Sequence, residues 1–190
     1  MRPIRAGISG NLVSPLQGVG SHNHYKISYI HHADLTCYEE DIKRELRAEF
    51  SGVEFINNGL SIDVIIDECL NQPPVQYCDS IIHIIAFDII ENSPKVLGAL
   101  FDIPTINFYG NDASDTGWFF TSSKLQKSAR RMLANDLWRN AFALIKHAGY
   151  QKIETTIGTK NGKSYLEKTH GFYNSDDGNG EGKALWIKDL

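Results

Sequence analysis

The segment FFTSSKLQKSARRML, residues 119–133, decides the fold of this chain. It starts inside a short aromatic strand predicted for residues 117–121 and passes through a polar loop into a long helix. Apolar residues at helical spacing predict that helix, and Gly149 stands at its expected end. These residues are Leu133, Leu137, Ala141, Leu144, Ile145 and Ala148. Because the first turn of a helix offers free backbone amides and the positive end of the helix dipole, this junction predicts an anion-binding site.

Positive side chains gather at this junction, namely Lys124, Lys127, Arg130 and Arg131. Cations are unfavourable beside a helix N-terminus, so their presence favours a bound anion, although a solvated basic first turn is the alternative. We expect all of these side chains to be mobile. The wider segment of residues 124–168 holds ten of the 19 Lys and Arg residues but only three of the 23 Asp and Glu residues. An anionic ligand is therefore expected in this part of the chain.

Hydrophobic periodicity predicts further elements on both sides of this segment. Before it we expect a strand at 25–30, a helix from Asp34 or Thr36 to Phe50, a helix at 62–70, strands at 80–90 and 95–108, and a loop at 110–115. After it we expect a strand at 153–157, a short helix at 163–168, and strands at 172–174 and 184–188. The order β-α-α-β-β-β-α-β-α-β-β predicts a mixed α/β fold.

Length and composition limit the classes of protein that fit. The chain has 190 residues, of which 42% are hydrophobic and 22% charged, as is typical of one globular domain. We expect an extended arm at residues 1–24 and a domain at residues 25–190. The net charge of −4 argues against nucleic-acid binding, and no apolar run fits a signal peptide or a membrane span. The three cysteines form no Cys-x-x-Cys pair and fit reduced thiols, so we expect a cytoplasmic protein.

Residues 124–129, KLQKSA, resemble the pyrophosphate loop of the GCN5-related N-acetyltransferase (GNAT) family, Arg/Gln-x-x-Gly-x-Gly/Ala. The element order is similar to that family's fold, and VLG at 96–98, AGY at 148–150 and KTHGF at 168–172 are further resemblances. The resemblance implies a GNAT-like mixed sheet with helices on both faces and acetyl-CoA as co-substrate. In the family the pantetheine arm pairs with the strand before the loop, and the pyrophosphate meets the loop amides. The implied cofactor-binding residues are Phe119, Phe120, Thr121, Lys124, Gln126, Lys127, Ser128, Ala129 and Arg130.

The same resemblance implies transfer of the acetyl group to an amine, whose identity the sequence does not specify. A general acid is needed because CoA leaves as a thiolate. The family frequently uses a tyrosine four residues before its Gly-Phe pair, where this chain has Glu167, and the nearest phenol is Tyr165. Tyr165 and Glu167 are therefore the candidate catalytic residues. The loop departs from the family at Lys127, which replaces the first glycine and either adds charge to the pyrophosphate site or fills it.

The base that deprotonates the amine is less clearly indicated. Asp88, Asp102 and Asp115 are candidates, directly or through water held between them, because burial raises a carboxylate pKa toward neutrality. Each is better explained as a turn or strand-edge residue, and the sequence singles out none of them as the base.

The histidines predict no metal site. His22, His24, His31 and His32 match no common zinc spacing and have no cysteine beside them. His83 lies inside an apolar strand, which predicts a hydrogen-bonded core histidine.

A looser resemblance links the aromatic strand and altered loop to acetyltransferase-like proteins of short-tailed phages, some of which are associated with virion assembly. It implies an alternative function as a non-catalytic structural or assembly protein. In that case the arm at residues 1–24 contacts virion partners or a second copy of the chain, in the host cytoplasm or the virion.

Overall fold

The structure, a computed structural model, describes residues 25–56, 60–71, 80–88, 95–175 and 185–190. The predicted arm at residues 1–24 lies outside them. The strands are β1 (Tyr25–His31), β2 (Ile81–Asp88), β3 (Val96–Pro104), β4 (Ala113–Asp115), β5 (Phe119–Thr121), β6 (Lys152–Thr156), β7 (Tyr173–Ser175) and β8 (Leu185–Asp189). The α-helices are α1 (Glu39–Glu49), α2 (Ile62–Asn71), α3 (Lys127–His147) and α4 (Lys160–Tyr165), with a 3₁₀-helix at His32–Tyr38 and a π-helix at Leu166–His170.

Two sheets form the centre of the molecule. The first has the order β1-β2-β3-β5 and is antiparallel throughout, whereas the second has the order β4-β6-β8-β7 with β4 parallel to β6. Since β4 and β5 are separated only by residues 116–118, the chain passes from the second sheet to the first over a single short stretch. β5 pairs with β3, and β6 pairs with β4 and β8, so the two sheets diverge between β5 and β6.

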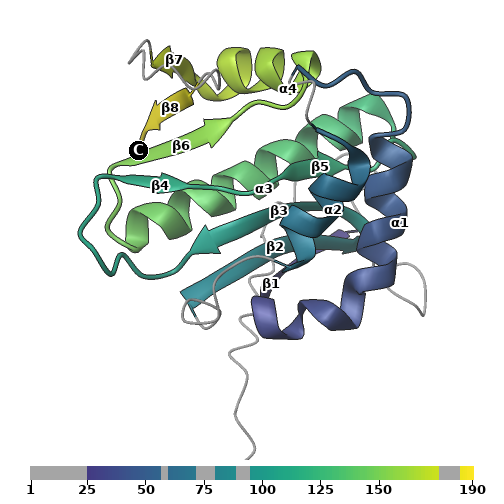
Figure 1. Ribbon diagram of the computed structural model, residues 1–190, viewed down its shortest axis with the longest axis horizontal. Helices are drawn as coiled ribbons and strands as arrows, with labels where there is room; N and C mark the ends of the chain where they lie inside the picture. Colours follow the sequence, from purple (N-terminus) through teal and green to yellow (C-terminus); the bar gives the residue numbers. More distant parts are fainter. Residues whose placement is uncertain (1–24, 57–59, 72–79, 89–94, 176–184) are drawn as a thin grey trace, which may run out of the picture.

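Helices cover both faces of the first sheet (Figure 1). Alternate residues of β2 enter different cores, because successive side chains of a strand point to opposite faces. Ile84 and Ala86 pack in the core under α3, and Ile85 and Phe87 pack in the core under α1 and α2. The predicted apolar face of α3 is buried as expected, with Leu133, Leu137, Ala141 and Ile145 each 0% exposed. The predicted mixed α/β fold with helices on both faces is confirmed.

Three local predictions were wrong. Residues 113–115, predicted as a loop, form β4, because they pair with β6, a strand that follows α3 in the sequence. Neither Asp34 nor Thr36 caps α1: a 3₁₀-helix occupies those positions, and Tyr38 precedes α1 without a side-chain cap. The C-terminal helix begins at Lys160 because the Thr159 hydroxyl caps its first turn, and it continues as a π-helix.

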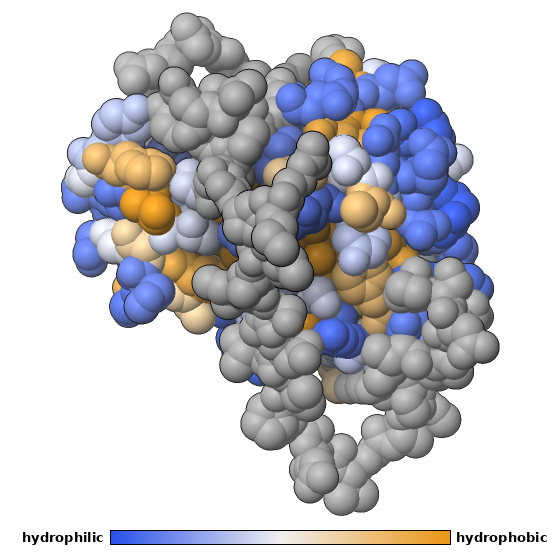
Figure 2. Space-filling view, turned by 90° about the horizontal axis from the view of Figure 1, so that it is seen from below, coloured by the Kyte–Doolittle hydropathy of each residue, from blue (hydrophilic) through white to orange (hydrophobic). Residues whose placement is uncertain are grey.

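One face of the molecule is mostly polar. On the face shown in Figure 2, hydrophilic residues cover most of the visible described surface, and apolar residues form separate groups among them. Within the described residues, no helix combines the length and the apolar character that crossing a membrane would need.

Candidate active site

Two cavities lie where the sheets diverge. The cationic cavity, of about 420 Å³, is lined by residues of β5, the first turn of α3 and the end of α1, including Glu49, Thr121, Lys127, Arg130 and Arg131. The acidic cavity, of about 530 Å³, lies toward β4 and β6, and its wall includes Glu68, Asp102, Asp115, Trp118 and Trp138. Both cavities share Phe50, Phe119, Thr159, Gly162 and Tyr165 in their walls. The aromatic pair Phe119 and Tyr165 therefore stands between an anion-attracting side and a cation-attracting side.

The N-terminus of α3 leaves its first amides available. The helix is preceded by Gln126, which makes no side-chain cap hydrogen bond, and the first intrahelical bond joins the Arg130 amide to the Gln126 carbonyl at 2.8 Å. The amides of Lys127, Ser128 and Ala129 therefore precede the helical hydrogen-bond pattern, as the first turn of a helix requires. Lys127 and Ser128 are exposed. This arrangement suits a bound anion.

Carboxylates of α1 hold two of the predicted loop cations. The Lys124 ammonium pairs with Glu45 at 2.7 Å, and Glu45 is only 4% exposed. The Arg130 guanidinium pairs with Glu49 and also donates to the Thr121 hydroxyl at 3.1 Å. The expectation that all the cations are mobile was therefore wrong for Lys124 and Arg130.

Two cations remain for an anion. Among the described residues, no carboxylate forms an ion pair with Lys127 or Arg131, and both side chains line the cationic cavity. Lys127 lines the cavity, and the cavity measures about 420 Å³ with this side chain in place. Of the other predicted cofactor residues, Phe119, Phe120, Thr121 and Arg130 line this cavity, whereas Lys124, Gln126, Ser128 and Ala129 lie on the loop beside it.

The free edge of β5 faces the divergence of the sheets. The Ser122 amide donates to the Leu97 carbonyl at 2.7 Å, and the Trp118 carbonyl accepts from the Phe101 amide at 3.0 Å, so both residues direct their polar groups toward β3. Because backbone groups alternate along a strand, the amides of Phe119 and Thr121 point the other way, toward β6. β5 thus offers unpaired amides to an extended ligand in the gap.

Tyr165 and Glu167, the two candidate acids, occupy different surroundings. The Tyr165 hydroxyl donates to Asn135 Oδ1 at 2.9 Å and lies 2.9 Å from His170 Nε2, and its ring stacks on Phe119 with centroids 6.0 Å apart. Since the hydroxyl proton goes to Asn135, His170 donates from Nε2. Burial raises the pKa of Tyr165 and keeps it protonated. Glu167 is half-buried and lines neither cavity.

A π-helix separates Tyr165 from the Gly-Phe pair. A π-helix closes i to i+5 hydrogen bonds, so it holds one more residue per turn than an α-helix. Here the Gly171 amide donates to the Leu166 carbonyl, and Gly171 itself has φ +71°. Counting back along a regular α-helix from the Gly-Phe pair leads to Glu167, whereas the wider turn changes the register and Tyr165 lines both cavities.

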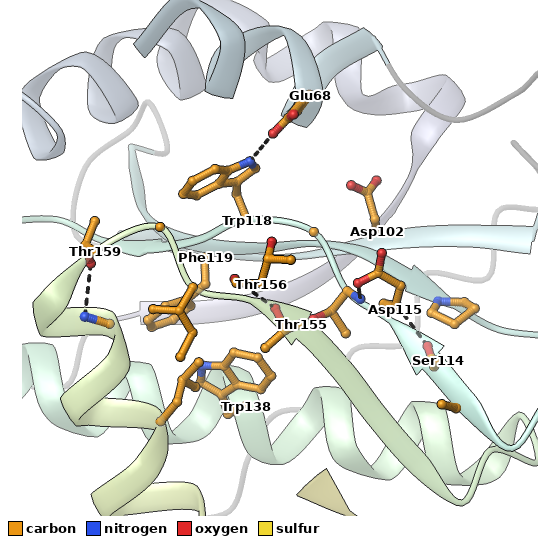
Figure 3. A pocket seen from close by; sticks show the side chains of 18 of the residues that line it. Glu68, Asp102, Ser114, Asp115, Trp118, Phe119, Trp138, Thr155, Thr156 and Thr159 are labelled. Atoms are coloured by element: carbon orange, nitrogen blue, oxygen red, sulfur yellow. Dashed lines mark hydrogen bonds between the residues drawn. The ribbon is translucent and has the colours of Figure 1, made fainter. Parts of the chain in front are cut away.

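Carboxylates from three elements meet in the acidic cavity (Figure 3). Asp102 comes from β3, Asp115 from the end of β4 and Glu68 from α2. Burial, then the charges of Asp115 and Glu68, raise the pKa of Asp102 to about 7. Burial also raises the pKa of Asp115, partly offset by the hydrogen bond that its carboxylate accepts from the Thr116 amide at 2.8 Å. Asp102 is still 26% exposed, so a ligand in the cavity can reach it.

Close backbone approaches shape this wall. Asp102 has φ +57° at an irregularity in the β2–β3 pairing, a conformation that is uncommon outside glycine. A Cβ on Gly117 would lie 2.3 Å from Asp102 Oδ2, and a Cβ on Gly158 would lie 2.5 Å from the Trp118 ring. Trp118 is further fixed by a hydrogen bond from its indole nitrogen to Glu68. Both glycines are therefore needed where they stand.

His83 accepts a hydrogen bond from the backbone of Asp102. The Asp102 amide donates to His83 Nδ1 at 3.3 Å, so the other ring nitrogen carries the proton and donates to His32 Nδ1 at 3.0 Å. Burial, then the neighbouring His32, lower the pKa of His83 to about 3, so the ring is neutral. The prediction of a hydrogen-bonded core histidine is confirmed, with His83 0% exposed.

His32, His83 and Asp102 offer possible metal-ligand atoms within 4.8 Å of one another, although the sequence predicted no metal site. Because both ring nitrogens of His83 are engaged, we interpret the cluster as a hydrogen-bonded support for Asp102. His22 and His24 of the predicted histidine cluster lie outside the described residues, and His31 is exposed.

Comparison with solved structures identifies the fold. PaiA N-acetyltransferase from Thermoplasma acidophilum, in complex with coenzyme A, matches with a TM-score of 0.59 and 16% identity over 87% of this chain and 99% of that chain. A GNAT-family acetyltransferase from Staphylococcus aureus Mu50 matches with a TM-score of 0.57 and 16% identity over 86% and 99%. A GNAT-family acetyltransferase from Streptococcus pneumoniae matches with a TM-score of 0.53 and 14% identity over 87% of this chain and 99% of that chain. The chain has the GNAT fold. No protein-family model and no curated protein sequence matches it.

The GNAT fold places the predicted loop and strand at the divergence of the sheets, where the resemblance implied a cofactor cleft. Of the three candidate bases, Asp102 and Asp115 come together in the acidic cavity, and Asp88 lines neither cavity. Sequence reasoning missed Glu68 and Trp118. The only local signal for Glu68 is its place beside the buried stripe of α2, next to Cys69, and such a position is usually a solvated one.

Proposed function

We propose that the protein is an acyl-CoA-dependent N-acyltransferase that passes an acetyl group from acetyl-CoA to an amine. The observation that carries this proposal is the pair of oppositely charged cavities that share the wall formed by Phe119 and Tyr165. An anionic cofactor suits one side and an amine suits the other. The GNAT fold supports the same assignment, and one of the solved structures that share it was determined in complex with coenzyme A.

In the proposed complex, the pyrophosphate of CoA contacts the first amides of α3, with Lys127 and Arg131 supplying charge. The pantetheine arm runs along the free edge of β5, where the amides of Phe119 and Thr121 are available. The thioester then lies beside Tyr165. One of these strand amides polarises the thioester carbonyl, as an oxyanion site does.

Transfer requires an amine without its extra proton. Asp102 accepts the proton, directly or through water, and its raised pKa suits a base at neutral pH. The amine nitrogen bonds to the carbonyl carbon, and the carbon–sulfur bond breaks. Tyr165 turns its hydroxyl proton from Asn135 to the departing thiolate. The nitrogen releases its second proton to water, from which Tyr165 is reprotonated, and Asp102 returns its proton to solvent. Tyr165 is suited to the role because it is neutral, hydrogen-bonded and next to both cavities.

Calorimetry with CoA and with pantetheine, which lacks the pyrophosphate, tests the proposal. CoA is expected to bind at least 10-fold more tightly than pantetheine and to weaken as salt is added, because charge contacts supply the difference. Equal affinities would remove the pyrophosphate site. Absence of CoA binding at about 1 mM would remove the transferase function.

The alternative from the sequence is a structural or assembly protein. It rests on residues 1–24, and a variant lacking them tests it. An assembly role predicts that this truncation changes the oligomeric state measured by light scattering and leaves CoA binding unchanged. An unchanged oligomeric state would count against that role.

A further inference from the structure

The acidic cavity carries more negative charge than a single base needs. Glu68, Asp102 and Asp115 all line it, and the described residues of its wall include no Lys, Arg or His. These carboxylates come from α2, β3 and β4, so the fold gathers them from distant parts of the sequence. Figure 3 shows all of them around one cavity, with Trp118 between Glu68 and the cavity floor. The cluster is therefore part of a formed cavity and is not a solvated acidic face.

Within the described residues, no cation of the protein balances these charges. No Lys or Arg forms an ion pair with Glu68, Asp102 or Asp115. His83, whose Nδ1 lies 3.8 Å from Asp102 Oδ1, is neutral and fully buried. Bringing like charges together without a counter-ion is unfavourable, so a cation from outside stabilises the cavity.

Unpartnered polar atoms in the wall also indicate a ligand. Among the residues that the structure describes, none forms a hydrogen bond with the buried hydroxyl of Thr116, which is 8% exposed, or with Asp102 Oδ1. The indole nitrogen of Trp138, which is 2% exposed, is likewise without a partner. Buried polar atoms are almost always hydrogen-bonded, so these atoms call for a group that fills the cavity. The two oxygens accept hydrogen bonds, as an ammonium group requires.

We propose that the acyl acceptor is an aliphatic diamine or polyamine, held with one nitrogen at Asp102 and a second, protonated nitrogen at Glu68 or Asp115. This inference rests on the proposed transferase function. The first nitrogen loses its proton to Asp102 and attacks the thioester, while the second keeps its charge and holds the molecule. Trp118 and Phe50 supply apolar and aromatic surface for the methylene chain and a nearby cation. Acylation removes one positive charge, which weakens binding and favours product release.

Binding of 1,4-diaminobutane and n-butylamine, two amines with the same carbon chain, tests the inference. Titration calorimetry of the full chain with each amine is followed by titration with CoA on the same sample. The diamine is expected to bind at least 10-fold more tightly than the monoamine, because its second ammonium meets a carboxylate. Equal affinities would overturn the inference, as would preferred acylation of a neutral or anionic acceptor. CoA binding reports on the transferase function separately.

The variant Glu68→Gln, with Asp67→Asn as its matched control, tests whether Glu68 is responsible for the tighter binding of the diamine. The glutamine that replaces Glu68 still accepts the Trp118 hydrogen bond, whereas Asp67 lies exposed on the same helix and lines neither cavity. Glu68→Gln is expected to weaken diamine binding about 10-fold, to weaken n-butylamine binding much less, and to leave CoA binding unchanged. The control is expected to change none of these. Asp115→Asn serves as a second variant if Glu68→Gln is unfolded by circular dichroism. Unchanged diamine affinity in folded variants of both residues would contradict the inference.

Discussion

The two cavities differ in charge and in how the sequence encodes them. Six of the 14 residues that line the cationic cavity come from one continuous stretch, residues 119–131, in which strand, loop and helix N-terminus follow directly; the others come mainly from the end of α1 and from residues 159–165. The acidic cavity collects residues from α2, β3, β4, β6 and α4. The same residue pair, Phe119 and Tyr165, belongs to both walls. The cationic cavity, which is centred on one local motif, is thus joined to the acidic cavity, which forms only when the sheets have assembled.

This difference has a functional consequence. In the proposed function, backbone amides and a few cations hold the cofactor, and any local sequence of suitable shape supplies these groups. Side chains on separate elements select the proposed acceptor, and such side chains can change one at a time. The following variants test whether the two sides act independently, from the largest expected effect to the smallest.

Replacing Asp102 by Asn is expected to reduce kcat/KM for amine acylation about 1000-fold, because the base is lost while size is kept. In the wild type, kcat/KM should rise up to about pH 7, where Asp102 becomes ionised. The pH profile of kcat/KM for the variant should lose that inflection and show only the ionisation of the amine substrate. The titratable groups around Asp102 are Asp115, Glu68, Cys69, His83 and His32. A pH–rate series on both proteins checks this, and an inflection unchanged in the variant assigns the base elsewhere.

Replacing Tyr165 by Phe is expected to reduce kcat about 100-fold and to leave the dissociation constant of CoA nearly unchanged. The ring still stacks on Phe119, and only the proton donor is removed. Glu167→Gln is the matched comparison, because Glu167 lines neither cavity. Steady-state kinetics of both variants decides between the two candidate acids. A larger loss in Glu167→Gln would reverse the assignment.

Replacing Lys127 by Glu is expected to weaken CoA binding about 10-fold without affecting diamine binding. Its charge lies at the wall of the cationic cavity only. Lys146→Glu, at the exposed C-terminal end of the same helix, is the control and should leave CoA binding unchanged. Calorimetry at low and high salt measures the CoA affinity of both variants. If the two variants weaken CoA binding equally, the effect belongs to overall charge and not to the cavity.

Asp102→Asn is also expected to stabilise the fold. The carboxyl has a pKa of about 7 in the folded chain and 3.8 as its reference value, so its ionisation disfavours the folded state. As pH rises from about 4 to about 7, the wild type therefore loses stability that the uncharged variant retains. The free energy of unfolding should be higher in the variant by about 1–3 kcal/mol near pH 8, with a smaller difference near pH 4. Urea unfolding at both values checks the sign, and a variant less stable than the wild type near pH 8 contradicts it.

Much of the fold was predictable, and the reasons are local. The apolar stripe of α3 and the alternation in β6 report burial directly, because helices and strands repeat at fixed periods. The anion-binding geometry of the α3 N-terminus follows from the same prediction. The strand at residues 113–115 was missed, since its pairing with β6 involves residues far away in the sequence.

The site was predictable only in part. Asp102 and Asp115 were named as candidate bases together with Asp88, and no pattern in the sequence separated them. The acid was placed between Tyr165 and Glu167 because the count from the Gly-Phe pair assumes a regular helix, and the π-helix changes that count. Lys124 and Arg130 were expected to be mobile, but α1 brings Glu45 and Glu49 to them.

Apart from β4, the sequence by itself determined the element order, the covered sheet and the amide-rich entrance to α3, because each follows from periodicity and backbone geometry within a few turns. Only the tertiary structure decided which carboxylates face one another, which cations stay unpaired and which phenol stands between the cavities. Those properties depend on distances between elements remote in sequence, and both pKa shifts and ion pairs are set by such distances.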